Sequence, residues 1–220
     1  MKMKVLFFGD SITDAGRDYT ALYGEKSYGC GYVKYTATAL KKQGFTEKDI
    51  INRGINGNRI VDLYARIKAD CWNLNPDVIS ILIGVNDVWH EIEGGNGVEI
   101  DRFEKVYRML IEDTKAVLPN VKILLCEPFV LPGESTSYDE NKWKKFLSVY
   151  DYAAVVKKLA KEYGLCFIPL QNTLTETARK TDPYLLLFDG VHPAETGAKI
   201  IAEEWLKAFK EIKLKEDTRR

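Results

Sequence analysis

The chain has 220 residues, which is enough for one α/β domain with a buried core and leaves little room for a second. Hydrophobic residues make up 45% of the chain and charged residues 29%, a composition typical of a globular protein rather than a disordered, fibrous or membrane-spanning one. Its 32 basic and 32 acidic residues balance, which argues against a general polyanion binder. We therefore expect a single domain over residues 1–220 with no nucleic-acid partner.

The N-terminal segment does not resemble a signal peptide. Its apolar run, residues 5–8, ends at Gly9 and Asp10, whereas a signal peptide has a longer apolar region. The longest later apolar run, residues 78–85, is too short to cross a bilayer. The four cysteines form no C-x-x-C pair. These features predict reduced, structural cysteines and a cytoplasmic protein with no membrane partner.

Short apolar runs alternate with longer amphipathic ones along the whole chain. The apolar runs at 79–83 and 121–125 are nearly continuous, which suits parallel strands buried on both faces. In chain order, the pattern predicts strand 4–9, helix 32–43, strand 49–52, helix 59–73, strand 78–84, helix 100–117, strand 121–126, helix 142–163 and strand 165–169.

A final helix is expected directly after His192. Pro193 favours a helix start at this point, because proline is favoured at the first helical position. The apolar residues that follow are spaced by four, four and three positions, which predicts one buried stripe. The residues of this stripe are Ile201, Trp205, Phe209 and Ile212.

The alternation of strands and helices predicts an α/β fold, a three-layer sandwich around a five-stranded parallel sheet. Active sites in such sheets form beyond the carboxyl ends of the strands, so the residues that follow each strand are the candidates. Four segments are expected on this rim: Gly-Asp-Ser-Ile-Thr at 9–13, Arg-Gly-Ile-Asn-Gly-Asn at 53–58, Gly-Val-Asn-Asp at 84–87, and Asp-Gly-Val-His-Pro at 189–193, before the final helix.

One of the two histidines is a candidate general base. His192 follows Asp189 by three residues, so the carboxylate can reach one ring nitrogen and leave the other free to accept a proton. Ser11 follows a buried strand at a corner beside Gly9, where its hydroxyl can point into a cleft. Together, Ser11, His192 and Asp189 form a candidate nucleophile, base and orienting carboxylate.

An acyl-transfer site also needs hydrogen-bond donors for the negative oxygen of the tetrahedral intermediate. The backbone N–H groups of Ser11 and Gly54 and the side-chain amide of Asn86 are the predicted oxyanion donors, with Gly57 as the alternative in the second loop. No phosphate-binding, dinucleotide-binding, zinc-protease or calcium-loop motif is present. We therefore expect neither a cofactor nor a metal.

Several other residues near the predicted rim are candidates for contact with the substrate. Aromatic side chains can stack on sugar rings and line an acyl pocket, although core packing is the alternative for each of them. Phe188 is the strongest of these candidates because it immediately precedes Asp189. Asp10 is also assigned to the substrate site, with turn hydrogen bonding as the alternative. The predicted substrate-binding residues are Asp10, Trp89, Tyr184 and Phe188.

Two further polar residues follow the rim segments. His90 lies four residues beyond Asn86, and a surface histidine is the simpler interpretation than a catalytic one. Arg59 follows the second loop and can either touch the substrate or begin a solvated helix. The sequence leaves the roles of both open.

The four rim segments resemble, in order, the four sequence blocks of the SGNH (GDSL-type) hydrolases. The first block is similar to 9–13, the second to the loop around Gly54, the third to 84–87 and the last to 189–193. This resemblance implies a flavodoxin-like fold and hydrolysis of an ester through an acyl-serine intermediate. By the same resemblance, Ser11 is the nucleophile, His192 the base and Asp189 its helper, and Ser11, Gly54 and Asn86 stabilise the oxyanion.

Within this family, the segments at 52–63, 84–89 and 189–193 are most similar to those of bacterial xylan acetylesterases. The resemblance implies short-chain, especially acetyl, esters of carbohydrate as substrates, such as acetylated xylo-oligosaccharides. Two alternatives remain: a lysophospholipase or thioesterase that acts on longer acyl chains, and a non-catalytic, flavodoxin-like binding module. The sequence also allows a homo-oligomer.

Overall fold

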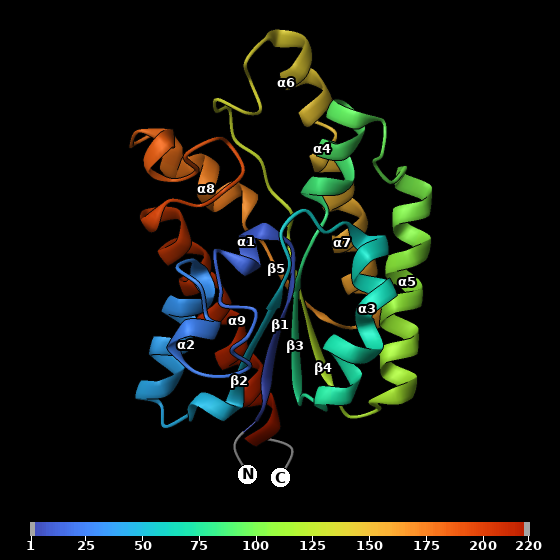
Figure 1. The fold of residues 1–220 in the computed structure, drawn as a ribbon, viewed down its shortest axis with the longest axis vertical. Coiled ribbons are helices and arrows are strands. Elements are labelled where there is room, and N and C mark those ends of the chain that lie inside the picture. Colours follow the sequence, from blue (N-terminus) through green and yellow to red (C-terminus); the bar gives the residue numbers. More distant parts are fainter. Residues whose placement is uncertain (1–2, 218–220) are drawn as a thin grey trace.

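A five-stranded parallel sheet lies at the centre of the molecule, in a computed structural model that describes residues 3–217 (Figure 1). The strand order is β2-β1-β3-β4-β5, and each pair of neighbours runs parallel. This arrangement confirms the predicted fold class, and every predicted strand is present. The strands are β1 (Val5–Gly9), β2 (Ile50–Gly54), β3 (Val78–Leu82), β4 (Lys122–Cys126) and β5 (Cys166–Ile168).

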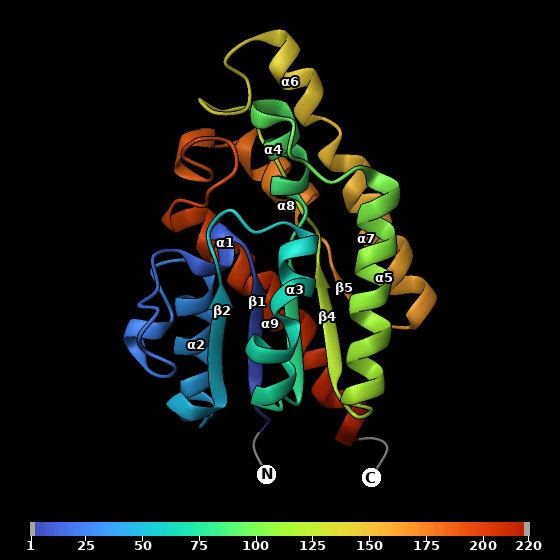
Figure 2. The same ribbon diagram turned by 45° about the vertical axis from the view of Figure 1, so that its right-hand side comes forward.

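Helices cover both faces of the sheet. On one face α2 packs against α9, and on the other α5 packs against α3 and α7, so the molecule has three layers (Figures 1 and 2). The helices are α1 (Ser11–Asp14), α2 (Tyr32–Lys42), α3 (Ile60–Asp70), α4 (Val85–Gly94), α5 (Ile100–Val117), α6 (Glu140–Phe146), α7 (Val149–Tyr163), α8 (Gln171–Ala178) and α9 (Glu195–Asp217).

The helix predicted over 142–163 is wrong, because the structure has two helices there, α6 and α7. They are separated at Ser148, whose hydroxyl donates a hydrogen bond to the carbonyl oxygen of Lys145 (2.7 Å). A serine hydroxyl bonded to a nearby carbonyl competes with the regular helical pattern, which explains the break.

Two other helix predictions also need correction. The final helix begins at Glu195 rather than at Pro193, because Pro193 pairs with Leu187 in an isolated antiparallel bridge. In addition, the sequence pattern predicts no helix at α1 or α4, yet Ser11 and Asn86 lie in the first turns of these helices.

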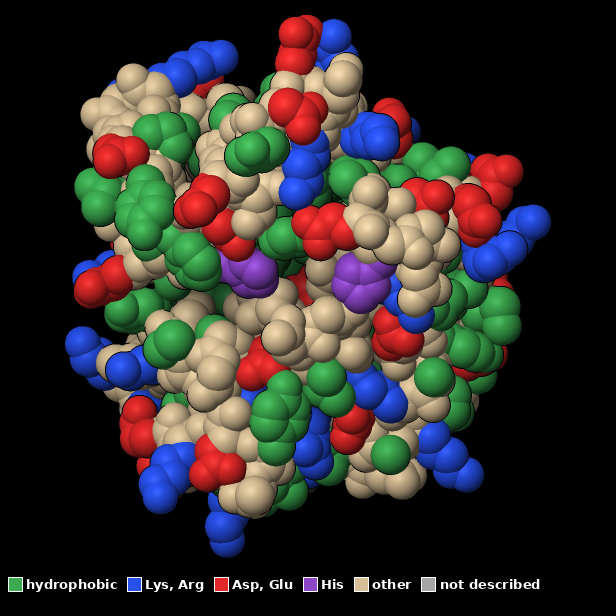
Figure 3. Space-filling model, turned by 45° about the horizontal axis from the view of Figure 1, so that its top comes forward, with side chains coloured by type: hydrophobic (Ala, Val, Ile, Leu, Met, Phe, Trp, Pro, Cys, Tyr) green, Lys and Arg blue, Asp and Glu red, His purple; other side chains and the backbone are tan. Residues whose placement is uncertain are grey.

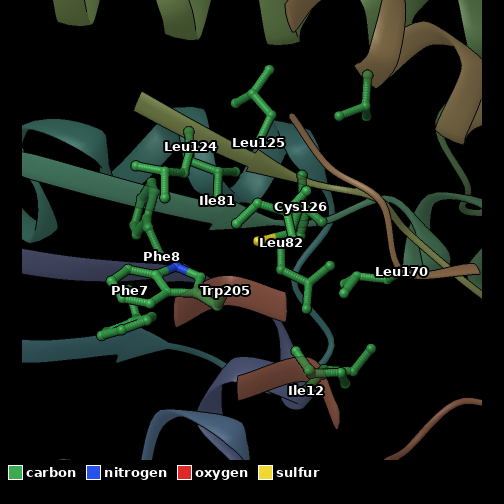
Figure 4. Packing of buried hydrophobic residues seen from close by; sticks show 14 of the residues in the cluster. Phe7, Phe8, Ile12, Ile81, Leu82, Leu124, Leu125, Cys126, Leu170 and Trp205 are labelled. Carbon is green, nitrogen blue, oxygen red and sulfur yellow. The ribbon is translucent and has the colours of Figure 1, made fainter. Parts of the chain in front are cut away.

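The C-terminal helix is anchored in the core by Trp205. This side chain is fully buried, and Figure 4 shows it beside Phe7 of β1. The ring centroids of Phe7 and Phe209 lie 5.1 and 4.8 Å from that of Trp205. Its indole N–H donates a hydrogen bond to the hydroxyl of Ser80 in β3 (2.9 Å). The predicted stripe is therefore confirmed: Ile201, Trp205 and Phe209 are buried and Ile212 is partly buried.

Replacement of Trp205 tests this anchor. We expect Trp205→Ala to lower the free energy of unfolding by about 3–5 kcal/mol, because it leaves a cavity and removes the hydrogen bond from the indole N–H to the buried Ser80 hydroxyl. Urea unfolding measures the change. Met109→Ala is the control, since Met109 is 44% exposed on α5, and we expect it to change stability by no more than about 0.5 kcal/mol. Equal effects of the two substitutions would contradict this account of the core.

Candidate active site

The candidate residues gather at the carboxyl ends of the parallel strands. The chain leaves β1 into α1, β2 into the loop before α3, and β3 into α4, so these three segments meet at one end of the sheet (Figure 1). Strand β1 lies between β2 and β3. From β1 the chain first adds β2 on one side and then continues with β3 on the other side, so the direction of the connections reverses at β1. Such a reversal leaves a crevice beyond the strand ends, where ligands of open α/β sheets bind.

Ser11 is held at the start of a one-turn helix. The side chain of Asp10 caps this helix by accepting a hydrogen bond from the backbone N–H of Ile12 (3.0 Å). At Gly9, an added Cβ would lie only 2.4 Å from the carbonyl oxygen of Leu82 in the neighbouring strand. Only glycine, which has no side chain, fits this close to β3 at the end of β1. Ser11 follows two residues later, at the start of α1.

The structure brings together the three side chains that the sequence predicted as a catalytic set. The hydroxyl of Ser11 lies 2.9 Å from Nε2 of His192, and Nδ1 of the same ring lies 2.7 Å from Oδ2 of Asp189. The other carboxylate oxygen of Asp189 accepts the backbone N–H groups of Val191 (2.9 Å) and His192 (2.7 Å). This arrangement allows the imidazole to take a proton from the serine hydroxyl while the carboxylate holds the ring in place.

A second segment supports the turn that carries Asp189 and His192. The backbone N–H groups of Leu131 and Ser135 donate to the carbonyl oxygens of Gly190 and Asp189, both at 2.9 Å. A Cβ added at Gly133 would lie 2.3 Å from the backbone nitrogen of Gly190, so the two segments are in close backbone contact. Sequence reasoning missed this support, because residues 131–135 carry no recognisable chemical motif.

Hydrogen bonding sets the protonation of the pair formed by Asp189 and His192. The hydrogen bond to Asp189 raises the pKa of His192 above its ordinary value, against the effect of burial. Burial alone would raise the pKa of Asp189, but hydrogen bonds from the His192 ring and from backbone N–H groups outweigh it and lower the pKa. Asp189 is therefore a carboxylate at neutral pH, which favours the protonated imidazole that a general base becomes.

The oxyanion prediction for Gly54 needs correction. Its N–H donates to the side-chain oxygen of Asn52 (2.8 Å), so this donor is already used. In the described residues, no hydrogen bond occupies the N–H of Gly57, the alternative in the same loop. The side-chain amide of Asn86 donates one N–H to the carbonyl oxygen of Asn58 (3.1 Å), which ties α4 to the loop that contains Gly57.

The prediction that Asp10 contacts the substrate also needs correction, because its side chain is only 1% exposed. Burial raises the pKa of Asp10 to about 7, and the pKa of Asp87, another buried carboxyl group at this end of the sheet, to about 8. Asp87 accepts the backbone N–H of Ile60 and so caps α3 (3.0 Å). Both side chains position helices rather than line the site.

Two of the three predicted aromatic contacts lie against His192. The ring of Phe188 stacks on the imidazole, with centroids 5.7 Å apart and planes inclined by 18°, and the centroid of Trp89 is 5.8 Å away. Tyr184 belongs to the short 3₁₀ helix Pro183–Leu185 and is 60% exposed. Phe188 and Trp89 are therefore the aromatic residues that the fold places beside the reactive groups.

The structure resolves the alternatives for Arg59 in favour of a helix start. Its guanidinium group donates to the carboxylate of Asp62 (2.9 Å) and to the backbone and side-chain oxygens of Asn96 (2.7 and 3.0 Å). These contacts hold the Arg59 side chain against the first turn of α3 and link that turn to the segment after α4. The guanidinium is thus engaged within the protein.

The fold and the serine–histidine–aspartate geometry define a serine hydrolase of the flavodoxin-like α/β class. Residues 7–200 match the model of the GDSL-like lipase/acylhydrolase family. The chain belongs to this family and is a carboxylic ester hydrolase. These findings confirm the resemblance that was read from the four sequence blocks.

Relatives of this chain include two bacterial acetylxylan esterases. The chain is 34% identical over 213 residues to that of Geobacillus stearothermophilus, covering 93% of this chain and 92% of the relative. It is 28% identical to that of Xylanibacter ruminicola, covering 94% of this chain but 43% of the longer relative. Among solved structures, a GDSL-like lipase from Parabacteroides merdae is similar with a TM-score of 0.84 and 38% identity, over 93% of this chain and 94% of that chain.

The structure of the Geobacillus stearothermophilus esterase is similar with a TM-score of 0.80 and 33% identity, over 94% of this chain and 96% of that chain. Substitutions of a serine, an aspartate and a histidine in that enzyme are described as catalytic mutants. Its aspartate and histidine are three positions apart, as are Asp189 and His192. A tryptophan precedes that aspartate, where this chain has Phe188.

Over residues 3–217, no helix is long and apolar enough to cross a membrane. In the same part of the chain, no cluster of three or more histidine, cysteine, aspartate or glutamate side chains is arranged to hold a metal ion.

The pH dependence of ester hydrolysis tests the Asp189–His192 pair. Because the imidazole must be neutral to accept a proton, kcat/KM rises with pH through the pKa of His192, which lies above its ordinary 6.5. Asp189→Asn removes the group that raises this pKa, so we expect the midpoint to move to lower pH. The plateau should fall by about 10³–10⁴-fold. Rates with 4-nitrophenyl acetate from pH 5 to 9 measure both effects, and an unmoved midpoint would count against the pairing.

Proposed function

We propose that the protein is an acetylesterase that removes acetyl groups from xylo-oligosaccharides through an acyl-enzyme on Ser11. One observation carries the proposed mechanism: the continuous hydrogen-bonded chain from the Ser11 hydroxyl through His192 to Asp189, with links of 2.9 and 2.7 Å. The known relatives named as acetylxylan esterases support the choice of substrate.

In the first half of the reaction, Oγ of Ser11 attacks the carbonyl carbon of the ester as its proton passes to Nε2 of His192. The tetrahedral intermediate then collapses: the bond to the sugar oxygen breaks, and His192 returns the proton to that oxygen. In the second half, a water molecule gives a proton to His192 and attacks the acetyl-serine. The serine then leaves with that proton, and acetate is released.

Three donors are proposed to stabilise the oxyanion: the backbone N–H groups of Ser11 and Gly57 and the side-chain amide of Asn86. Gly57 replaces Gly54 in this proposal because the Gly54 N–H is bonded within its own loop. The Asn86 amide is held by one hydrogen bond, to the carbonyl oxygen of Asn58, which leaves its second N–H available for the substrate.

The sugar is proposed to contact the aromatic side chains beside His192. Phe188 is 43% exposed and stacks on the imidazole, so one edge of its ring is available to a substrate. Trp89 adds a half-buried surface on another side of His192. Aromatic faces are well suited to the apolar faces of sugar rings.

A series of 4-nitrophenyl esters from acetate to octanoate tests the acyl-enzyme and the acyl length together. We expect the highest kcat/KM for acetate, and we expect Ser11→Ala to abolish turnover because the nucleophile is lost. Thermal unfolding of the variant controls for folding. A preference for octanoate would instead favour a lysophospholipase or thioesterase, and full activity of the variant would overturn the assignment of Ser11.

Substitution of Asn86 tests the proposed oxyanion site. Loss of one such donor reduces kcat by about 10²–10³-fold, and we expect this reduction for Asn86→Ala. Asn86→Asp keeps the size of the side chain but replaces the donor with an acceptor, so it should be at least as slow. Steady-state rates with 4-nitrophenyl acetate measure kcat. If Asn86→Asp were close to wild type, the amide could not be an oxyanion donor.

A further inference from the structure

Helix α4 carries a row of side chains along the candidate site. Asn86, Trp89, His90 and Glu93 are spaced by three, one and three residues, so they share one face of the helix. This face begins at the proposed oxyanion donor Asn86 and continues past Trp89, which lies against His192. His90 is the next side chain along it, and neither the mechanism nor the helix packing described above uses it.

His90 lies directly against the loop that carries the proposed Gly57 donor. A Cβ added at Gly57 would be 3.9 Å from both Cε1 and Nε2 of His90. Because Gly57 has no side chain, its backbone directly faces the imidazole ring of His90. His90 and His192 are the two histidines of the chain, and Figure 3 shows both on the same face, on opposite sides of a shallow recess.

The imidazole of His90 is free to bind a ligand. Over residues 3–217, neither of its ring nitrogens makes a hydrogen bond within the protein, and the side chain is half-buried. Its polar neighbours are engaged elsewhere: Arg59 with Asp62, and Glu93 with Lys142. A half-buried polar ring without a protein partner is stabilised when a ligand supplies the missing hydrogen bonds.

The charge state of His90 suits an uncharged, hydroxyl-bearing ligand. Burial and then the nearby Arg59 lower the pKa of this imidazole, and the carboxylates of Asp62 and Glu93 oppose them without reversing the shift. The ring is therefore neutral at neutral pH, with one nitrogen that donates and one that accepts. A sugar hydroxyl also donates and accepts, whereas an acetyl methyl group would leave both nitrogens unpaired.

We propose that His90 is a substrate-positioning residue that hydrogen-bonds a hydroxyl group of the sugar, on the side of the recess opposite His192. This inference rests on the proposed function, because it requires a saccharide as the alcohol part of the ester. His90 then selects sugar esters over simple esters by fixing how the sugar lies when its acetyl group reaches Ser11.

Comparison of two substrates tests the role of His90. Acetylated xylobiose has hydroxyl groups to bind, whereas 4-nitrophenyl acetate has none. We expect His90→Ala to raise KM for acetylated xylobiose by about three- to tenfold, the effect of one lost hydrogen bond, with kcat for 4-nitrophenyl acetate within about twofold of wild type. His90→Gln should recover most of the loss, because its amide both donates and accepts. His90→Leu is the matched control without polar groups and should behave like His90→Ala.

The outcomes separate this inference from the proposed function. If wild type hydrolyses acetylated xylobiose but His90→Ala does so equally well, the positioning role is overturned while the proposed function stands. Equal losses on both substrates would also overturn it, because His90 would then act only through the Gly57 loop. If wild type hydrolyses 4-nitrophenyl acetate but not acetylated xylobiose, the proposed substrate fails, and the inference fails with it.

Discussion

The hydrogen bond between Asp189 and Nδ1 of His192 is the interaction on which the rest of the site depends. It spans only three residues, and the same carboxylate also accepts two backbone N–H groups of that turn. The orientation of the imidazole is therefore decided locally. The remainder of the fold has to bring the Ser11 hydroxyl to Nε2, the ring nitrogen that Asp189 leaves free, and the two atoms lie 2.9 Å apart.

Two aspartates at this end of the sheet, Asp10 and Asp189, have different protonation states because their surroundings shift their pKa values in opposite directions. Asp189 is half-buried, but its carboxylate accepts three hydrogen bonds, so it remains ionised. Asp10, the neighbour of Ser11, is fully buried with one backbone N–H donor to its side chain, and its pKa rises to about 7. For Asp10 the effect of burial exceeds that of its hydrogen bonds, whereas for Asp189 the hydrogen bonds outweigh burial, so Asp189 is the carboxylate that stays ionised beside the imidazole.

Much of this could be predicted from sequence, because strongly apolar strands and chemically distinctive residues leave clear patterns. The juxtaposition of Ser11, Asp189 and His192 could be predicted because the chain has only two histidines, and one of them follows an aspartate by three residues. The hydrogen bond from the Gly54 N–H to the side chain of Asn52 could not be predicted, because residue type does not reveal which way a backbone N–H points. The break at Ser148 was likewise invisible, since it depends on a side-chain hydrogen bond to a carbonyl group inside an otherwise continuous helical pattern.

The anchoring of α9 by Trp205 has a consequence for when the enzyme can fold during its synthesis. Ser11 and His192 are 181 residues apart in the chain, and the hydrogen bond from Trp205 to Ser80 joins residues that are 125 positions apart. Contacts of such long range form only after most of the polypeptide is available, and they make folding slow compared with local contacts. On a ribosome, the early strands are made well before the helix that completes their core. Esterase activity therefore appears only in a finished chain, and its onset marks the end of folding.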